Sequence, residues 1–181
     1  MPRLPRLWSA EKVVIIHGLD PGYEQSALVV YEDVIVREHI TLANDDLLRR
    51  ISDRTRSGRD VLVVEQIASF GMPVGAEVFE TVMWSGRFIQ AWTGYRPPFM
   101  PWDRIKRHAV KQILCGNQRA KDANIRQALL DKFGPGKEKA IGRKSDQGPL
   151  YGLVGDEWAA LAVAVAWSEQ QLNVMAGKAA I

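Results

Sequence analysis

Three acidic positions stand where regular elements of the chain are expected to begin or end. Asp20 comes shortly after the apolar run 13–16, Glu65 follows directly on the apolar run 61–64, and Asp156 opens a long apolar helix. If the two runs form parallel strands, they end at the same edge of a sheet, and a helix start can bring a third acid there. The three carboxylates are then expected to converge.

Carboxylates that converge without a neutralising base repel one another, which raises their pKa values, and a divalent cation relieves this repulsion. Hard carboxylate oxygens suit Mg²⁺, for which Mn²⁺ can substitute. Two such ions about 4 Å apart can activate a water molecule and stabilise the leaving oxygen in phosphodiester hydrolysis. The acids therefore predict a site for two Mg²⁺ or Mn²⁺ ions with this chemistry.

Each acid also has a purely structural alternative. Asp20 precedes a Pro-Gly pair and is suited to a turn, while Asp156 and Glu157 are suited to the positive end of a helix. Glu65 could be a solvated strand end, but it follows four apolar residues without a turn signal of its own, which favours a functional set. The sequence has no HExxH, CxxC or Gly-x-Ser-x-Gly motif, and residues 18–22 lack the lysine of a phosphate loop.

The surrounding elements form one α/β pattern. Apolar runs bounded by turn signals predict strands at residues 13–16, 26–31, 34–40 and 61–64. Helical periodicity predicts helices at residues 42–56, 74–92, 102–114, 120–133 and 156–172. The first three strands are expected to form an antiparallel meander, and the crossover helix before the fourth implies a parallel pairing. The sequence therefore predicts an α/β fold with a mixed central sheet flanked by helices.

The chain is expected to form a single domain over residues 13–172, preceded by a flexible basic arm at 1–12 and followed by a tail at 173–181. Residues 97–101 are too rich in proline for a central strand and are expected to be an extended segment. Residues 134–155 are rich in glycine and are expected to be a mobile surface loop. His17 lies inside the first strand, where we expect it to be packed or hydrogen-bonded rather than catalytic.

The composition is that of an ordinary globular protein, with 46% hydrophobic and 25% charged residues. The net charge of +3 permits a polyanionic partner without requiring one. Lys and Arg are concentrated between residues 96 and 144, where they form either a solvated helical face or a binding surface. The single cysteine, Cys115, excludes an internal disulfide and fits a reducing compartment. No apolar stretch is long enough to span a bilayer, so we expect a cytoplasmic protein without membrane contact.

Four segments resemble the RuvC family of Holliday junction resolvases. Residues 18–22 with Ser26-Ala27 resemble the opening strand and hairpin of that family, and residues 63–66 resemble its second acidic motif. Residues 101–121 are similar to its basic helix and glycine turn, and residues 156–166 to its final acidic helix. The matches occur in the family's order over residues 13–167.

The resemblance implies an RNase H-like fold, a homodimer, Mg²⁺ dependence and paired nicks in four-way DNA junctions. It assigns catalysis and metal binding to Asp20, Glu65 and Asp156. The chain departs from the family at Ala159, where a further aspartate is typical. Glu157 is the nearest substitute, and Asp122 is another candidate. Compact resolvases that diverge in this way are typical of bacteriophages, so a viral source is one expectation. The protein would then act in the cytoplasm of a bacterial host.

DNA contacts are expected along the basic segment, because phosphate binding needs Lys and Arg on one surface. The candidates are Lys111 and Lys121, with Arg104, Lys106 and Arg107. Phe70, in the loop after Glu65, either wedges into an opened junction or packs in the core. The helix at 74–92 has more apolar surface than one sheet face needs, so its surplus side is expected to pack against a second subunit in a twofold dimer.

Three alternative functions remain open. A nuclease of the same fold that acts on flaps, other branched intermediates or RNA would need the same acids. A junction-binding protein without catalysis is favoured by Ala159. A kinase or ATPase of the actin-like group shares the opening strand and hairpin, but the chain is too short for the two halves that such proteins require.

Overall fold

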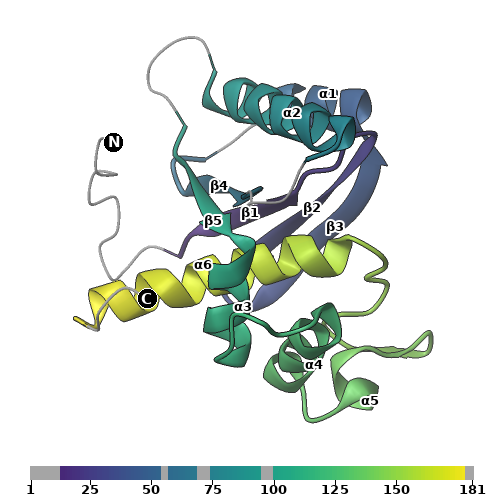
Figure 1. Ribbon diagram of the computed structural model, residues 1–181. Coiled ribbons are helices and arrows are strands. Elements are labelled where there is room, and N and C mark those ends of the chain that lie inside the picture. The colour runs from purple at the N-terminus through teal and green to yellow at the C-terminus, as the bar shows by residue number, and fades with distance from the viewer. Residues whose placement is uncertain (1–12, 54–56, 69–73, 95–99, 178–181) are drawn as a thin grey trace.

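The computed structural model describes residues 13–53, 57–68, 74–94 and 100–177, which are built around a five-stranded mixed sheet (Figure 1). In order across the sheet, the strands are β3 (Ile35–Ala43), β2 (Gln25–Glu32), β1 (Ile15–Asp20), β4 (Asp60–Gln66) and β5 (Trp102–Lys106). The first three form antiparallel pairs, whereas β4 and β5 run parallel to β1. The predicted meander and the parallel fourth strand are confirmed.

Helices cover both faces of the sheet. Helices α1 (Asn44–Asp53) and α2 (Ala76–Thr93) lie on one face, above the sheet in Figure 1. Helix α6 (Glu157–Met175) crosses the other face, with α3 (Arg107–Cys115) and α4 (Asp122–Phe133) beyond it. Buried apolar residues form one cluster on each side of the sheet. The prediction of a mixed sheet flanked by helices is therefore confirmed.

Helix α6 lies unusually close to β1. A Cβ atom placed on Gly18 would be 2.3 Å from the carbonyl oxygen of Ala160 and 2.9 Å from the Cβ of Ala164, so only glycine fits at this position. The buried side of α6 is rich in alanine, which allows the helix backbone to approach the strand. This contact fixes the first turns of α6 over the carboxyl-terminal half of β1.

His17 and Asp60 form a buried pair between β1 and the start of β4. The His17 Nε2 atom lies 2.6 Å from Asp60 Oδ1, and the His17 side chain is completely buried. The backbone N–H and the hydroxyl of Ser57 both donate hydrogen bonds to Asp60 Oδ2. Burial acts to raise the pKa of Asp60, but the bonds from His17 and Ser57 outweigh it and lower this pKa to about 2. The expectation that His17 is hydrogen-bonded is confirmed.

The helix expected at residues 102–114 is wrong in its first part, because residues 102–106 form strand β5 and α3 begins only at Arg107. β5 is the edge strand, so only one of its two hydrogen-bonding edges is paired, to β4. Ile105 is buried against the α6 side of the sheet, and Asp103 on the same side accepts a hydrogen bond from the Trp167 indole of α6 at 2.8 Å. The charged residues Asp103, Arg104 and Lys106 suggested a solvated helix.

The prediction of a mobile loop at residues 134–155 is also wrong. This segment contains helix α5 (Lys137–Ala140) and a small hairpin of β6 (Gly142–Arg143) and β7 (Asp146–Gln147). Gly142 has a positive φ of 73°, and a Cβ on Gly148 would lie 2.4 Å from the carbonyl oxygen of Lys139 and 2.5 Å from that of Ala140. The glycines therefore allow tight turns, and the buried Leu150 returns the segment to the core.

The other expected elements are present with shifted ends. Helix α6 continues to Met175, so the tail predicted from residue 173 begins later than expected. The predicted arm at residues 1–12 and most of the proline-rich segment 97–101 lie outside the described residues. Within the described part of the chain, no helix is both long and apolar enough to cross a membrane.

The His17–Asp60 pair predicts a specific pH dependence of stability. The pKa of Asp60 is lowered from 3.8 to about 2, so its stabilising effect is present above about pH 4 and is lost as the pH falls toward 2. We expect Asp60→Asn to lower the free energy of unfolding by about 2 kcal/mol at pH 7, the typical contribution of a hydrogen bond to a charged group. Denaturant unfolding at pH 7 and pH 2.5 measures both values, and an equal loss at both would contradict this assignment.

Candidate active site

Asp20 and Glu65 lie side by side at the carboxyl ends of two parallel strands. Leu19 of β1 pairs with Val64 of β4, so Asp20 and Glu65 occupy the next step of the same register. Leu19 and Val64 belong to the core under α1 and α2. Because side chains alternate along a strand, Asp20 and Glu65 face the opposite side, toward α6. Both are largely withdrawn from solvent.

Asp156 reaches the same edge from the start of α6. It is the N-cap residue of that helix and precedes by one turn Ala160, the residue that contacts Gly18. Burial is the largest cause that raises the pKa of Asp20, and Glu65 adds to it; Asp156 and Asp122 contribute less, while Arg107 acts in the opposite direction. The net effect raises the pKa of Asp20 to about 7. The three predicted acids are thus close enough for the charges of Glu65 and Asp156 to affect Asp20. Their catalytic roles stay predictions.

Arg107 forms ion pairs within this group of acids. Its Nη1 atom donates to Glu65 Oε2 at 2.9 Å, and its Nη2 atom donates to Asp122 Oδ1 at 2.7 Å. Burial raises the pKa of Glu65 and Arg107 lowers it, with a net increase. The expectation of acids without a neutralising base is therefore wrong. Arg107, predicted as a DNA contact, and Asp122, named as a substitute for the missing acid, both lie beside Glu65.

Glu157 is held away from this group by other partners. Its Oε2 atom lies 2.8 Å from Nδ1 of His39 and accepts a hydrogen bond from the backbone N–H of Val154 at 3.1 Å. The hydroxyl of Thr41 donates to Oε1 at 3.4 Å, and only 5% of Glu157 is exposed. These contacts tie the start of α6 to β3, so Asp156 is the acid that this helix presents to the edge of the sheet.

The donor set suits a hard divalent cation, although it is not closed around one. No three His, Cys, Asp or Glu side chains in the described ranges form a ready-made metal site. The available donors are carboxylate oxygens, which Mg²⁺ and Mn²⁺ prefer. Burial and the neighbouring acids raise the pKa of Asp20, and a divalent cation relieves repulsion of this kind.

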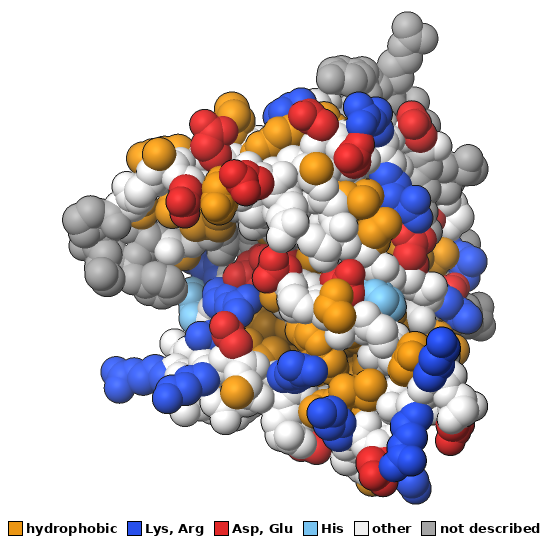
Figure 2. All heavy atoms as spheres, turned by 90° about the vertical axis from the view of Figure 1, so that its right-hand side faces the viewer, with side chains coloured by type: hydrophobic (Ala, Val, Ile, Leu, Met, Phe, Trp, Pro, Cys, Tyr) orange, Lys and Arg blue, Asp and Glu red, His pale blue; other side chains and the backbone are white. Residues whose placement is uncertain are grey.

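The predicted DNA contacts lie around the same edge of the sheet. Lys111 of α3 is close enough to Glu65 to lower its pKa, and Lys121 is the exposed N-cap residue of α4. Arg104 and Lys106 are exposed on β5, while Phe70 lies outside the described residues. Figure 2 shows acidic side chains gathered near the centre of one face, with Lys and Arg side chains spread below them. This face therefore combines an acidic centre with a basic border.

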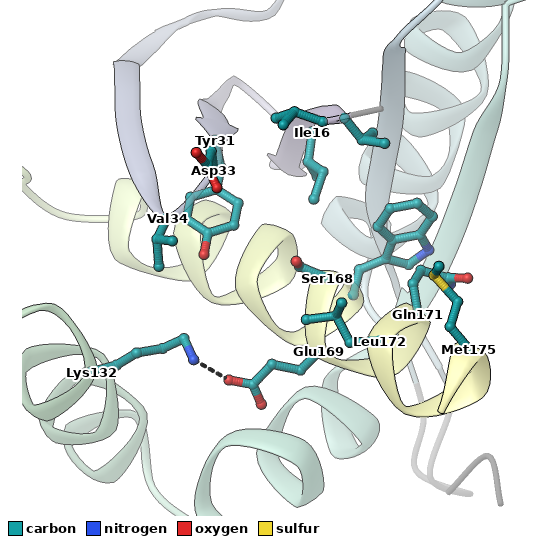
Figure 3. Close-up of a pocket in the computed structure, with 13 residues that line it drawn as sticks. Ile16, Tyr31, Asp33, Val34, Lys132, Ser168, Glu169, Gln171, Leu172 and Met175 are labelled. Carbon is teal, nitrogen blue, oxygen red and sulfur yellow. Dashed lines mark ion pairs between the residues drawn. The ribbon is translucent and has the colours of Figure 1, made fainter. Parts of the chain in front are cut away.

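A separate hollow of about 300 Å³ lies near the far end of α6 (Figure 3). Its lining includes Tyr31 and Val34 from the β2–β3 hairpin and Leu172 from α6, and the ion pair between Lys132 and Glu169 (2.7 Å) borders it. Most of its lining is apolar, and no group of acids converges on it. The acidic edge of the sheet is therefore the better candidate for metal chemistry.

Comparison with known proteins places the fold. No family model matches the sequence, and no curated protein is similar enough in sequence to count as a relative. The Thermus thermophilus RuvC structure matches with a TM-score of 0.60 and 14% identity, over 92% of this chain and 99% of that chain. The structure of T. thermophilus RuvC in complex with Holliday junction substrate matches with a TM-score of 0.62 and 15% identity, over 92% and 98%.

These matches show the fold. The mixed five-stranded sheet with α6 on one face and α1 and α2 on the other is the RNase H-like fold of RuvC. The fold implied by the sequence resemblance is confirmed over nearly the whole length of the solved RuvC chains.

The coupling between the two strand acids can be measured directly. We expect Glu65→Gln to lower the pKa of Asp20 from about 7, because a neighbouring negative charge that raises it is removed. Titration of the Asp20 carboxyl carbon by NMR, without metal, gives this value. Glu38→Gln, a carboxylate of β3 paired with Arg50, is the control and should leave Asp20 unchanged. An unaltered Asp20 titration in Glu65→Gln would show that the two acids do not interact.

Proposed function

We propose that this chain is a divalent-metal-dependent endonuclease that cleaves phosphodiester bonds in four-way or other branched DNA. The observation that carries the proposal is the adjacency of Asp20 and Glu65 on parallel strands, facing the start of α6 where Asp156 stands. The likeness to RuvC, one structure of which is titled as a complex with Holliday junction substrate, supports junction DNA as the substrate.

Asp20, Glu65 and Asp156 are the residues that would hold Mg²⁺ or Mn²⁺. Such an ion would lower the pKa of a bound water molecule and would stabilise the negative charge that develops on the phosphate. Asp20 and Glu65 are partly buried, and the hydrogen bond from Arg107 at 2.9 Å orients the Glu65 carboxylate. In the overall step, a water oxygen forms a bond to phosphorus and the bond from phosphorus to the leaving oxygen breaks. One proton of the attacking water passes to solvent, and the leaving oxygen takes up a proton from solvent.

Basic residues on the same face would position the DNA. Lys111 and Lys121 flank the acids from α3 and α4. Arg104 and Lys106 alternate with Ile105 along β5 and therefore point to the α1 and α2 side, so they would contact DNA only where it passes around the edge of the sheet. Contacts of this type bind the phosphate backbone irrespective of base sequence. Recognition of a branched structure would then depend on the shape of the face rather than on base contacts.

Paired cleavage requires two centres, and α2 offers a surface for a twofold dimer. Phe79, Val82 and Met83 lie on this helix with exposures of 65%, 53% and 53%. Their spacing puts them on one side of the helix, away from the face that buries Phe88 and Trp92. Self-association through this stripe would cover apolar surface and relate two acidic centres by a twofold axis.

A non-catalytic junction-binding protein is the second candidate. Ala159 leaves the acid set one carboxylate short of the family's usual number, and Arg107 already binds Glu65. This candidate predicts tight junction binding without nicking in either Mg²⁺ or Mn²⁺.

Cleavage of a labelled four-way junction distinguishes the candidates. We expect symmetric nicks in Mg²⁺ and none in EDTA. Asp20→Asn should lower the rate by at least about 100-fold, because it removes a charged carboxylate that would hold the ion. Each tenfold loss corresponds to about 1.4 kcal/mol of transition-state stabilisation. Linear duplex DNA and an RNA–DNA hybrid of the same sequence are the substrate controls. Binding without cleavage would favour the second candidate, and cutting of the hybrid alone would indicate a different nuclease.

The dimer surface is tested by charge. We expect Phe79→Asp to convert the protein from a dimer to a monomer, because burying an unpaired carboxylate in an apolar interface is costly. Light scattering at micromolar concentration measures the mass. Val174→Asp places the same charge at another exposed apolar position, on α6, and should leave the dimer intact. A monomeric wild-type protein would contradict the proposal.

A further inference from the structure

Arg107 stands where its positive charge meets the acids of the proposed site. It begins α3 directly after β5, whose residue Ile105 pairs with Glu65 in the sheet. This register brings the guanidinium to the Glu65 carboxylate at 2.9 Å. The side-chain exposures of Arg107 and Glu65 are 29% and 13%, so the pair is largely shielded from solvent and from salt.

Arg107 is the basic residue that contacts the acids of this group, while Lys111 acts on Glu65 more weakly. Asp20, Glu65, Asp156 and Asp122 are the acids that influence one another here, and Arg107 donates to two of them. A guanidinium stays protonated under all ordinary conditions and presents a rigid, planar set of donors. Arg107 therefore supplies a permanent positive charge in contact with two of these acids.

The carboxylate oxygens that are left to bind metal are also few. A carboxylate that bridges two metal ions gives one oxygen to each, but Oε2 of Glu65 is already bonded to Arg107. Asp122, the acid nearest to the guanidinium on its other side, is likewise bonded to it at 2.7 Å. The position that would supply a further carboxylate from α6 is Ala159. The donors left for metal are those of one ion rather than two.

We propose that Arg107 replaces one of the two divalent cations of a two-ion centre, so that this chain binds a single ion. The inference rests on the proposed function and revises the expectation of two ions. Asp20, Asp156 and the Oε1 atom of Glu65 would hold the ion, and Arg107 is a positioning residue that orients Glu65. The same guanidinium would face the phosphate that the ion binds, as arginine commonly does.

Counting bound Mn²⁺ tests this directly. Equilibrium dialysis of the full-length wild-type protein against Mn²⁺ alone should give one ion per chain, and Arg107→Gln should give two. Arg107→Lys keeps the positive charge and should remain at one. Arg50→Gln is the matched control, because it removes an arginine that pairs with Glu38 away from these acids, and it should not change the count. Circular dichroism establishes that each variant is folded.

The outcomes separate this inference from the proposed function. Two ions bound by the wild type, or an unchanged count in Arg107→Gln, would overturn the role of Arg107, while junction cleavage by the same preparation would leave the nuclease proposal standing. Two ions bound by Arg107→Lys would show that charge does not set the count and would also overturn it. A wild-type protein that binds no Mn²⁺ would overturn both proposals.

Discussion

The close packing of α6 against Gly18 is the contact on which the rest of the site depends. β1 alone would present Asp20 at the edge of a sheet, as many α/β proteins present a polar residue there. The missing side chain at Gly18 lets the Ala160 carbonyl and Ala164 approach the strand, which sets the height and direction of the helix. Asp156 is one helical turn from that contact, so its position follows from the packing. A larger residue at position 18 would separate α6 from the sheet and with it one acid from the other two.

Two further interactions hold the acidic edge from its two sides. Glu157 joins the start of α6 to His39 and Thr41 of β3, and Arg107 joins Glu65 to Asp122 at the start of α4. The Glu157 and Glu65 side chains are largely withdrawn from solvent, whereas Asp122 is exposed. Charged groups that are shielded in this way interact strongly and tolerate little misplacement. These contacts tie the acids to elements that are remote in sequence. Arg107 compensates only part of the repulsion between the acids.

The parts of this arrangement that sequence analysis predicted are those set by local pattern. Continuous apolar runs indicated buried parallel strands, and their ends indicated Asp20 and Glu65. The polar content of residues 102–106 suggested a helix, because Trp102 and Ile105 pack on opposite faces of the strand with charged residues between them in the sequence. The role of Arg107 could not be predicted, because its partners lie 42 and 15 residues away and only the sheet register brings them together.

The segment between α4 and α6 can change in length more easily than the elements that hold the acids. It leaves the core after Phe133, touches it again at the buried Ala140 and returns at Leu150. Acids of the centre stand on both of its flanking helices, Asp122 at the start of α4 and Asp156 at the start of α6. Those acids are fixed by packing and by Arg107, not by the length of chain between the helices. Insertions there cost only the slowly growing entropy of a longer loop. The length and shape of this excursion can therefore change in evolution while the acids beside it keep their positions.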